Sequence, residues 1–295
     1  MARSSPDRLA RLESEHPEWR PWLLPLARAR RAASSAVWQT CLPTTALEAG
    51  DETPPLLAGA VIAVEPRLLA TWLAELAGAA AEAGSASAGS LRARAGSLDA
   101  LAVLEAGLDQ DRRRLAALAA DVGVQSGALE AVAGLLAWPL LQTCGQQWAH
   151  RIPPSWRGGY CPICGAWPTL AETRGVERVR RFRCGRCGSD WHADWLRCPY
   201  CGMAEHDRLG SLVSELAAGR RRVDVCRACG GYVKGLTTLQ ATPAPDVAVA
   251  DLASVDLDVV ALEHGFTRPE GAGYPLGLRV VETPRRGRRL FAWRA

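Results

Sequence analysis

Lysine is almost absent from this chain of 295 residues: Lys234 is the only one, and arginine supplies every other basic side chain. Aromatic residues make up only 6% of the chain, and eleven of the eighteen are tryptophan. An arginine- and alanine-rich composition of this kind is typical of a GC-rich coding genome and indicates no function by itself. Hydrophobic residues make up 48%, enough for a packed core, and the length fits two domains of ordinary size.

Long apolar runs are also missing. The longest, AVAGLLAWPLL at 131–141, is shorter than the ~20 residues that a helix needs to cross a bilayer, so we expect no membrane insertion. The first residues, MARSSPDRLARLESEHPEW, are charged and contain no apolar core of an export signal. We therefore expect a cytoplasmic protein. In that reducing compartment, paired cysteines favour metal binding over disulfides.

The chain contains no GxGxxG fingerprint of a dinucleotide- or flavin-binding fold. Its charge is unevenly distributed. Residues 151–235 carry 15 basic and 8 acidic side chains, whereas residues 1–150 have a net charge of −3 and residues 236–295 a net charge of zero. A basic segment of this kind could contact nucleic acid or an acidic protein surface.

Residues 1–152 show the apolar spacing of helices and predict a bundle of five to seven of them, a scaffold rather than a catalytic domain. Ser5-Pro6 should cap a first helix, and Pro25 should begin or kink the next. Glu65-Pro66 should start another helix, and Ser97 should open one after a loop of small residues at 84–90.

A Pro/Gly-rich boundary at 152–160 separates this half from short alternating segments that predict strands, VRRFRC, WHADWLRC, RRRVDVC and GYVKGL. The expected fold class is therefore α+β and multidomain. An all-α domain over 1–152 should be followed by small β lobes at 153–196 and 197–242. Residues 243–295 should form one helix, ending at Gly265, and a basic solvated tail.

Four CxxCG turns stand between residues 161 and 230: CPICG, CGRCG, CPYCG and CRACG. Two thiolates two residues apart can bind one ion, and the glycine suits the backbone twist of such a turn. A tetrahedral Cys₄ site needs two of these turns, called knuckles below. The eight candidate metal ligands are Cys161, Cys164, Cys184, Cys187, Cys198, Cys201, Cys226 and Cys229.

The knuckles are separated by 19, 10 and 24 residues, and the two longer gaps each fit a hairpin. This spacing favours sequential pairing of the first knuckle with the second and of the third with the fourth. A cross-braced pairing, first with third and second with fourth, stays open at this point. Spacing does not distinguish zinc from iron, because both accept four thiolates. A closed Cys₄ site leaves no position for Lewis-acid catalysis, and we expect no enzyme activity.

The remaining candidates have simpler interpretations. Cys41 and Cys144 lie far from any knuckle and should be buried free thiols. His192, five residues after Cys187, should lie beside a site or on the surface rather than replace a ligand. Trp191 and Trp195 should share a strand face and cover the metal sites or the domain interface.

The C-terminal run resembles the formate dehydrogenase accessory proteins, the FdhE family. The resemblance covers about residues 155–280 and lies in YCPICGAWP, RFRCGRCGSDWHADWLRCPYCG, VDVCRACGGYVKGL and ADLASVDLD, in that order. It implies a helical domain followed by two rubredoxin-like lobes, with iron at all eight cysteines. It also implies a cytoplasmic maturation factor that binds the catalytic subunit of a respiratory formate dehydrogenase before export. The family supplies no certain catalytic residue.

Other functions fit parts of the pattern. A nucleic-acid-binding zinc ribbon would explain the basic run Arg174, Arg178, Arg180, Arg181 and Arg183, but no recognition helix accompanies it. A rubredoxin-like electron-transfer component would explain two Cys₄ iron sites. A zinc domain of the DnaJ kind also has four CxxC turns, but it requires CxxCxGxG, which CRACGGYV does not complete.

Overall fold

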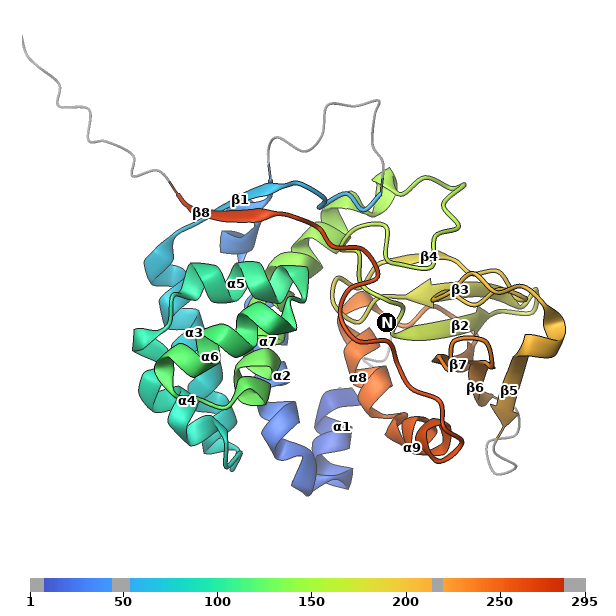
Figure 1. Ribbon diagram of the computed structural model, residues 1–295, viewed down its shortest axis with the longest axis horizontal. Helices are drawn as coiled ribbons and strands as arrows, with labels where there is room; N and C mark the ends of the chain where they lie inside the picture. Colours follow the sequence, from blue (N-terminus) through green and yellow to red (C-terminus); the bar gives the residue numbers. More distant parts are fainter. Residues whose placement is uncertain (1–7, 44–53, 214–219, 284–295) are drawn as a thin grey trace, which may run out of the picture.

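The structure is a computed structural model that describes residues 8–43, 54–213 and 220–283 (Figure 1). Its helices are α1 (Arg8–Glu15), α2 (Arg20–Ala33), α3 (Pro66–Glu82), α4 (Ala88–Arg94), α5 (Ala100–Asp109), α6 (Arg112–Val122), α7 (Ser126–Trp148), α8 (Val247–Leu252) and α9 (Val255–Glu263). Its strands are β1 (Val61–Val64), β2 (Leu170–Arg174), β3 (Val179–Arg183), β4 (Asp190–His192), β5 (Leu209–Val213), β6 (Arg221–Cys226), β7 (Tyr232–Thr238) and β8 (Arg279–Glu282).

Helices α1–α7 form one side of the molecule, and the larger sheet forms the other (Figure 1). Helix α7 packs against α2, α3, α5 and α6, and its buried apolar residues are not confined to one face. By length and composition alone, the helical stretch Ser126–Arg151 could cross a membrane, but 67% of its most apolar window is buried inside the molecule. It is therefore best explained as the central core helix of the bundle.

Side-chain caps set several helix starts. Glu65 accepts hydrogen bonds from the backbone N–H groups of Arg67 and Leu68, with Pro66 in the first turn, as the sequence predicted. Asp99 caps α5, so the prediction that Ser97 opens this helix was wrong by two residues. Pro25 lies inside α2 rather than at its start. The expected loop at 84–90 was also too long, because α4 already begins at Ala88. The Ser5-Pro6 cap lies outside the described residues.

Six strands form one continuous sheet in the order β4-β3-β2-β7-β6-β5. Each lobe contributes three consecutive antiparallel strands: β2, β3 and β4 in the first lobe, and β5, β6 and β7 in the second. The lobes join where β2 runs parallel to β7, with Leu170 opposite Lys234. The two predicted lobes are thus two copies of one unit that share a sheet. WHADWLRC is a strand only at its start, since β4 ends at His192.

The C-terminal segment departs most from expectation. The single helix expected to end at Gly265 is two short helices, α8 and α9, which cover one face of the sheet. The chain then returns to the helical half, where β8 pairs in parallel with β1 (Figure 1). The N-terminal half is therefore not purely α. The overall α+β class holds, the residue boundaries of the four domains stay a prediction, and the basic tail lies outside the described residues.

Two candidate Cys₄ metal centres

All four knuckles adopt the same turn. In each, the N–H of the glycine after the second cysteine donates to the carbonyl of the first, at 2.9–3.0 Å. The N–H of the first cysteine donates to the carbonyl five residues on. The four glycines have φ values of +67° to +75°, a region that side chains disfavour. The repeated CxxCG sequence therefore encodes one backbone shape four times.

The sulfurs gather in two groups, Cys161/Cys164/Cys184/Cys187 and Cys198/Cys201/Cys226/Cys229, each with all Sγ atoms within 4.8 Å of one another. The Sγ–Sγ distances are 3.4 and 3.5 Å across the first group and 3.7 Å for two pairs of the second. The grouping is the sequential one, and the cross-braced alternative is not found. Each hairpin, β2–β3 or β5–β6, brings its two flanking knuckles together.

These distances fit a bound ion. A tetrahedron of four sulfurs at about 2.3 Å from a zinc ion has edges of about 3.8 Å, close to the spacing found here. Four thiolates accept ferrous, ferric or zinc ions equally well by donor type. The eight cysteines can therefore hold two ions, and neither group offers an open coordination position.

The first centre is fully enclosed, with all four cysteines buried. Ser189 Oγ lies 3.0 Å from Cys161 Sγ and 3.1 Å from Cys187 Sγ. Burial raises the pKa of Cys161 and Cys187, whereas hydrogen bonds from neighbouring thiols lower the pKa of Cys184. Because metal binding requires thiolates, an ion in this apolar position would release protons as it binds.

Helix α7 docks directly on the second knuckle. Trp138 Nε1 donates to the carbonyl of Gly185 at 2.9 Å, and Gln142 Nε2 donates to that of Arg186 at 3.0 Å. One turn further along α7, a Cβ on Gly145 would lie 1.8 Å from the carbonyl oxygen of Cys187. The helix can approach the metal centre this closely only because residue 145 has no side chain.

We expect Gly145→Ala to lower the free energy of unfolding by roughly 2–3 kcal/mol, because a backbone clash forces α7 away from the knuckle. Gly134→Ala is the matched control in the same helix, since a Cβ there meets no described atom within 4 Å. It should stabilise the protein by roughly 0.5–1 kcal/mol through helix propensity. Denaturant unfolding of both variants measures the difference; equal stabilities would contradict the docking geometry.

The second centre is more open. Cys198 and Cys226 are buried, but Cys201 and Cys229 are exposed. Tyr200 of the third knuckle donates from its Oη to the carbonyl of Tyr232 at 2.7 Å within the lobe, and its ring packs edge-on against Trp167 of the first lobe. The two centres thus share their ligand geometry and differ in access to solvent.

Lys234, the only lysine, is fully buried on β7 and was not recognised as a structural centre from the sequence. Its Nζ lies 2.6 Å from Asp251 Oδ1 and 2.7 Å from Asp258 Oδ2. Arg268 contacts the same two carboxylates at 2.7 and 2.9 Å. The GYVK and ADLASVDLD segments, both part of the family resemblance above, therefore meet in one network that fixes α8 and α9 to the sheet.

The network also shifts the pKa values of Asp258 and Tyr232. Burial opposes ionisation of Asp258, but the positive charges of Arg268 and Lys234 hold its pKa below the ordinary value. Burial and the hydrogen bond to Asp258 raise the pKa of Tyr232 to about 12, so its hydroxyl stays protonated and donates. Asp258 is thus ionised when the network forms.

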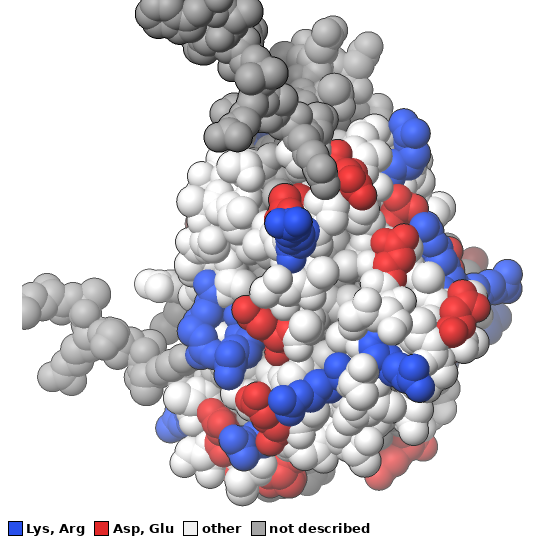
Figure 2. All heavy atoms as spheres, turned by 90° about the vertical axis from the view of Figure 1, so that its left-hand side faces the viewer, with Lys and Arg blue, Asp and Glu red and all other residues white. Residues whose placement is uncertain are grey.

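Most arginines of the basic run form ion pairs within the sheet. Arg183 and Arg174 pair with the buried Glu172, and Arg174 and Arg181 pair with Asp190. Arg180 pairs with Asp224 on the second lobe. On the face formed by the helical half, basic and acidic side chains are interspersed (Figure 2). Internal pairing weakens the interpretation of these arginines as a nucleic-acid contact.

The other residues singled out from the sequence have defined places. Cys41 and Cys144 are buried and belong to neither sulfur group. His192 Nε2 lies 3.1 Å from Asp194 Oδ1 and is not in a sulfur group either. Trp191 is buried and donates to the carbonyl of Gly158 at 3.0 Å. The expectation that Trp195 shares its strand face was wrong: Trp195 follows β4 and is 48% exposed.

No family model matches the chain. Among curated proteins, it is 33% identical over 119 residues to an FdhE homologue of Aquifex aeolicus, 39% of this chain and 41% of that one. It is 32% identical over 139 residues to an FdhE homologue of Serratia proteamaculans, 44% of each chain, and 30% identical over 141 residues to FdhE of Salmonella dublin, 45% of each. The aligned part spans less than half the length of these relatives.

The fold extends the likeness beyond the aligned sequence. The crystal structure of FdhE from Pseudomonas aeruginosa superposes with a TM-score of 0.57 at 22% identity, covering 92% of this chain and 93% of that one. At this identity the match concerns the fold alone. This chain is thus similar in sequence to FdhE proteins over less than half of its length, and it shares the fold of an FdhE structure along nearly the whole chain.

Proposed function

We propose that this protein is a cytoplasmic accessory factor for a respiratory formate dehydrogenase. In this proposal it binds the catalytic subunit before export and is needed for the enzyme to become active. The observation that carries the proposal is the pair of Cys₄ centres within a fold that matches an FdhE structure along the chain. The FdhE relatives imply the accessory role.

We assign one iron ion to each centre, with zinc as the alternative. Four thiolates accept either metal, and the sulfur spacing suits both. Because both donor sets are closed, the ions would hold the knuckles together or carry electrons rather than activate a substrate. On this basis the protein acts on its client by binding, and not as an enzyme.

A rubredoxin-like electron-transfer role is the second candidate, and the exposure of Cys201 and Cys229 favours it. Solvent exposure and hydrogen bonding to the sulfurs set the potential of an iron–thiolate site. A reversible iron–thiolate absorbance, together with turnover by an electron donor, would support this role. A redox-inert protein that still binds its client would support the accessory role alone.

The proposal is tested by anaerobic capture. The tagged protein is recovered from soluble extract of the native host, and co-eluting proteins are identified by mass spectrometry. The eluate is also measured for iron, zinc and iron–thiolate absorbance. We expect two metal ions per chain and a formate dehydrogenase catalytic subunit. Recovery of nucleic acid with zinc, and no such subunit, would contradict the proposal.

A further inference from the structure

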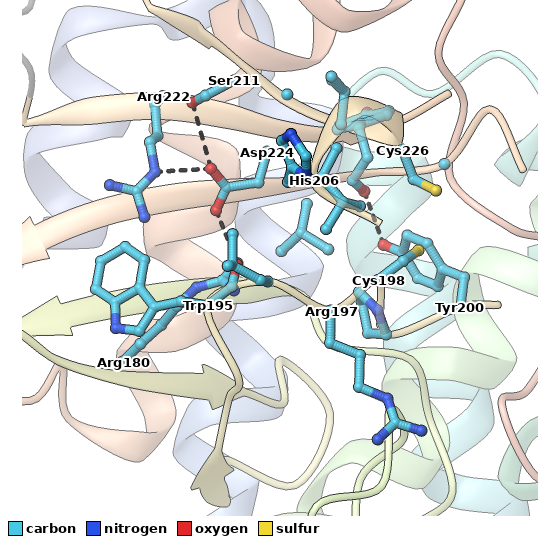
Figure 3. A pocket seen from close by; sticks show the side chains of 18 residues that line it. Arg180, Trp195, Arg197, Cys198, Tyr200, His206, Ser211, Arg222, Asp224 and Cys226 are labelled. Atoms are coloured by element: carbon cyan, nitrogen blue, oxygen red, sulfur yellow. Dashed lines mark hydrogen bonds and ion pairs between the residues drawn. The ribbon is translucent and has the colours of Figure 1, made fainter. Parts of the chain in front are cut away.

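A pocket of about 400 Å³ lies on the second lobe, between the sheet and the linker that joins the two lobes (Figure 3). Its lining includes Cys198 and Cys226 of the second metal centre. On β6, Arg222 and Asp224 face this pocket, whereas Val223 points to the other side and packs with Leu257 of α9. The face that α8 and α9 leave uncovered is thus hollowed next to the metal.

The charged side chains of this pocket are arranged around one aromatic ring. The guanidinium carbons of Arg180 and Arg222 lie 5.5 and 5.2 Å from the ring centroid of Trp195. Both arginines also contact the single carboxylate of Asp224, at 2.8 and 2.7 Å. Two cations sharing one anion leave a net positive charge beside the ring, which the carboxylate of Asp194 partly offsets at Arg180; Arg197 also lines the pocket, but its guanidinium points away from the ring (Figure 3).

Arg180 is buried and only partly compensated: its guanidinium pairs with Asp224 and donates to the carbonyls of Asp194 and Trp195. Its side chain is only 4% exposed, and its Nε has no hydrogen-bond partner among the described residues. Burial lowers its pKa even though the charge of Asp224 acts in the opposite direction. A further negative group nearby would therefore stabilise the guanidinium.

Apolar surface adjoins this charge. Trp195 is 48% exposed and its neighbour Leu196 is 63% exposed, and both line the pocket. An exposed tryptophan beside arginine is typical of the residues that dominate protein–protein binding energies. The pocket thus suits a ligand with both an acidic and an apolar group.

The pocket also meets a sheet edge. Leu209, Gly210 and Ser211 line it and belong to β5, the last strand of the six-stranded sheet. Within residues 8–43, 54–213 and 220–283, β6 is the only strand that pairs with β5. An edge strand presents free N–H and C=O groups to which an extended peptide can add.

We propose that this pocket receives an extended acidic segment of a partner polypeptide. A carboxylate of the segment lies against Arg180 and Arg222, and an adjacent apolar side chain covers Trp195. The segment follows the edge of β5. That the partner is the client oxidoreductase rests on the function proposed above; the preference for an acidic peptide rests on the pocket itself.

Ser211 offers a sign-sensitive test, because it is exposed and its Oγ lies 3.3 Å from Asp224 Oδ1. Ser211→Asp adds a repelling charge, and Ser211→Lys adds an attracting one. The probe is a fluorescein-labelled peptide of alternating Glu and Phe, followed by fluorescence anisotropy. We expect Ser211→Asp to weaken binding about tenfold or more and Ser211→Lys to strengthen it, with both differences reduced by salt.

Three controls accompany these variants. Arg208→Gln removes a positive charge from the same lobe outside the pocket and should bind as the parent protein does. Trp195→Ala should weaken binding without changing its salt dependence. Every variant should retain two metal ions. Three results would overturn the proposal. These are equal affinity of the Ser211→Asp and Ser211→Lys variants for the probe, equal affinity of the parent protein for a Lys–Phe peptide and for the Glu–Phe probe, and displacement of the probe by formate alone.

The same variants distinguish this pocket from the proposed function. Capture of a formate dehydrogenase catalytic subunit by the parent protein but not by Ser211→Asp would support both. Equal capture of the subunit by both proteins would contradict the proposed role of the pocket but not the accessory role. Failure of the parent protein to capture any client, with peptide binding still in the predicted charge order, would overturn the accessory role and support the pocket.

Discussion

Cys161→Ser is expected to remove one metal ion and to destabilise the whole protein, whereas Cys226→Ser should remove the other ion with a smaller effect. The first centre is buried under α7, so its loss frees the sheet from the helical half. The second centre lies at the surface, where Cys201 and Cys229 are exposed, and α7 does not dock on its knuckles. Structural metal sites supply about 10 kcal/mol or more of folding free energy in small domains, comparable with the ~5–15 kcal/mol that stabilises most proteins.

Double variants test the pairing even where a single variant is poorly folded. If the centres are sequential, Cys161→Ser combined with Cys187→Ser removes ligands of one site and leaves one ion bound. Cys161→Ser combined with Cys198→Ser disrupts both sites and leaves none. Metal content by mass spectrometry under native conditions, with thermal unfolding followed by circular dichroism, measures both effects. The opposite order of metal content would be the signature of cross-braced pairing.

Lys234→Met is expected to lower the free energy of unfolding by about 3–5 kcal/mol. The substitution keeps a long side chain but leaves Asp251 and Asp258 with Arg268 as their one cationic partner among the residues that the structure describes. A partly buried carboxylate that loses its partner retains the cost of desolvation. Denaturant unfolding, monitored by far-UV circular dichroism, measures the change.

Arg221→Gln is the matched control for this network. Arg221 also links β6 to α9 through an ion pair with Asp256, but the two side chains are 36% and 60% exposed. Such a surface pair should contribute at most about 1 kcal/mol. Adding Asp251→Asn to Lys234→Met should recover part of the lost stability, because Arg268 then has one carboxylate to compensate rather than two. If the two single variants were equally stable, Lys234 would not hold the position assigned to it.

The sequence allowed the local features to be predicted where one short motif fixes one backbone shape. The CxxCG turns are such motifs, because a thiolate pair and a glycine at positive φ recur at fixed spacing. Helix periodicity similarly predicted most of the bundle. Strand β1 and helix α4 were missed. Strand β1 has only four residues, and α4 has only seven and begins within a stretch of small residues, so neither shows enough periodicity to be assigned.

The missed contacts are those between residues distant in the chain. Nothing near Lys234 in the sequence indicates that it is buried, because its two aspartates lie 17 and 24 residues away. The positive charge of the basic run was evident from the sequence, but its ion pairs were not. They depend on the register of β2 and β3, which places Glu172 opposite Arg181 and within reach of Arg183. The Arg180–Trp195–Arg222 arrangement likewise requires both lobes.

The sequence by itself predicted the eight candidate thiolate ligands, the turn that each pair adopts and the helical character of the first half, and its hairpin-length gaps favoured sequential pairing. Each of these features depends on residues that lie close together in the sequence. The tertiary structure alone decided that both lobes share one sheet, that α7 encloses one centre while the other stays open, and that a cationic pocket forms beside the open one. These features depend on which surfaces are removed from water together, and that is a property of packing between distant segments.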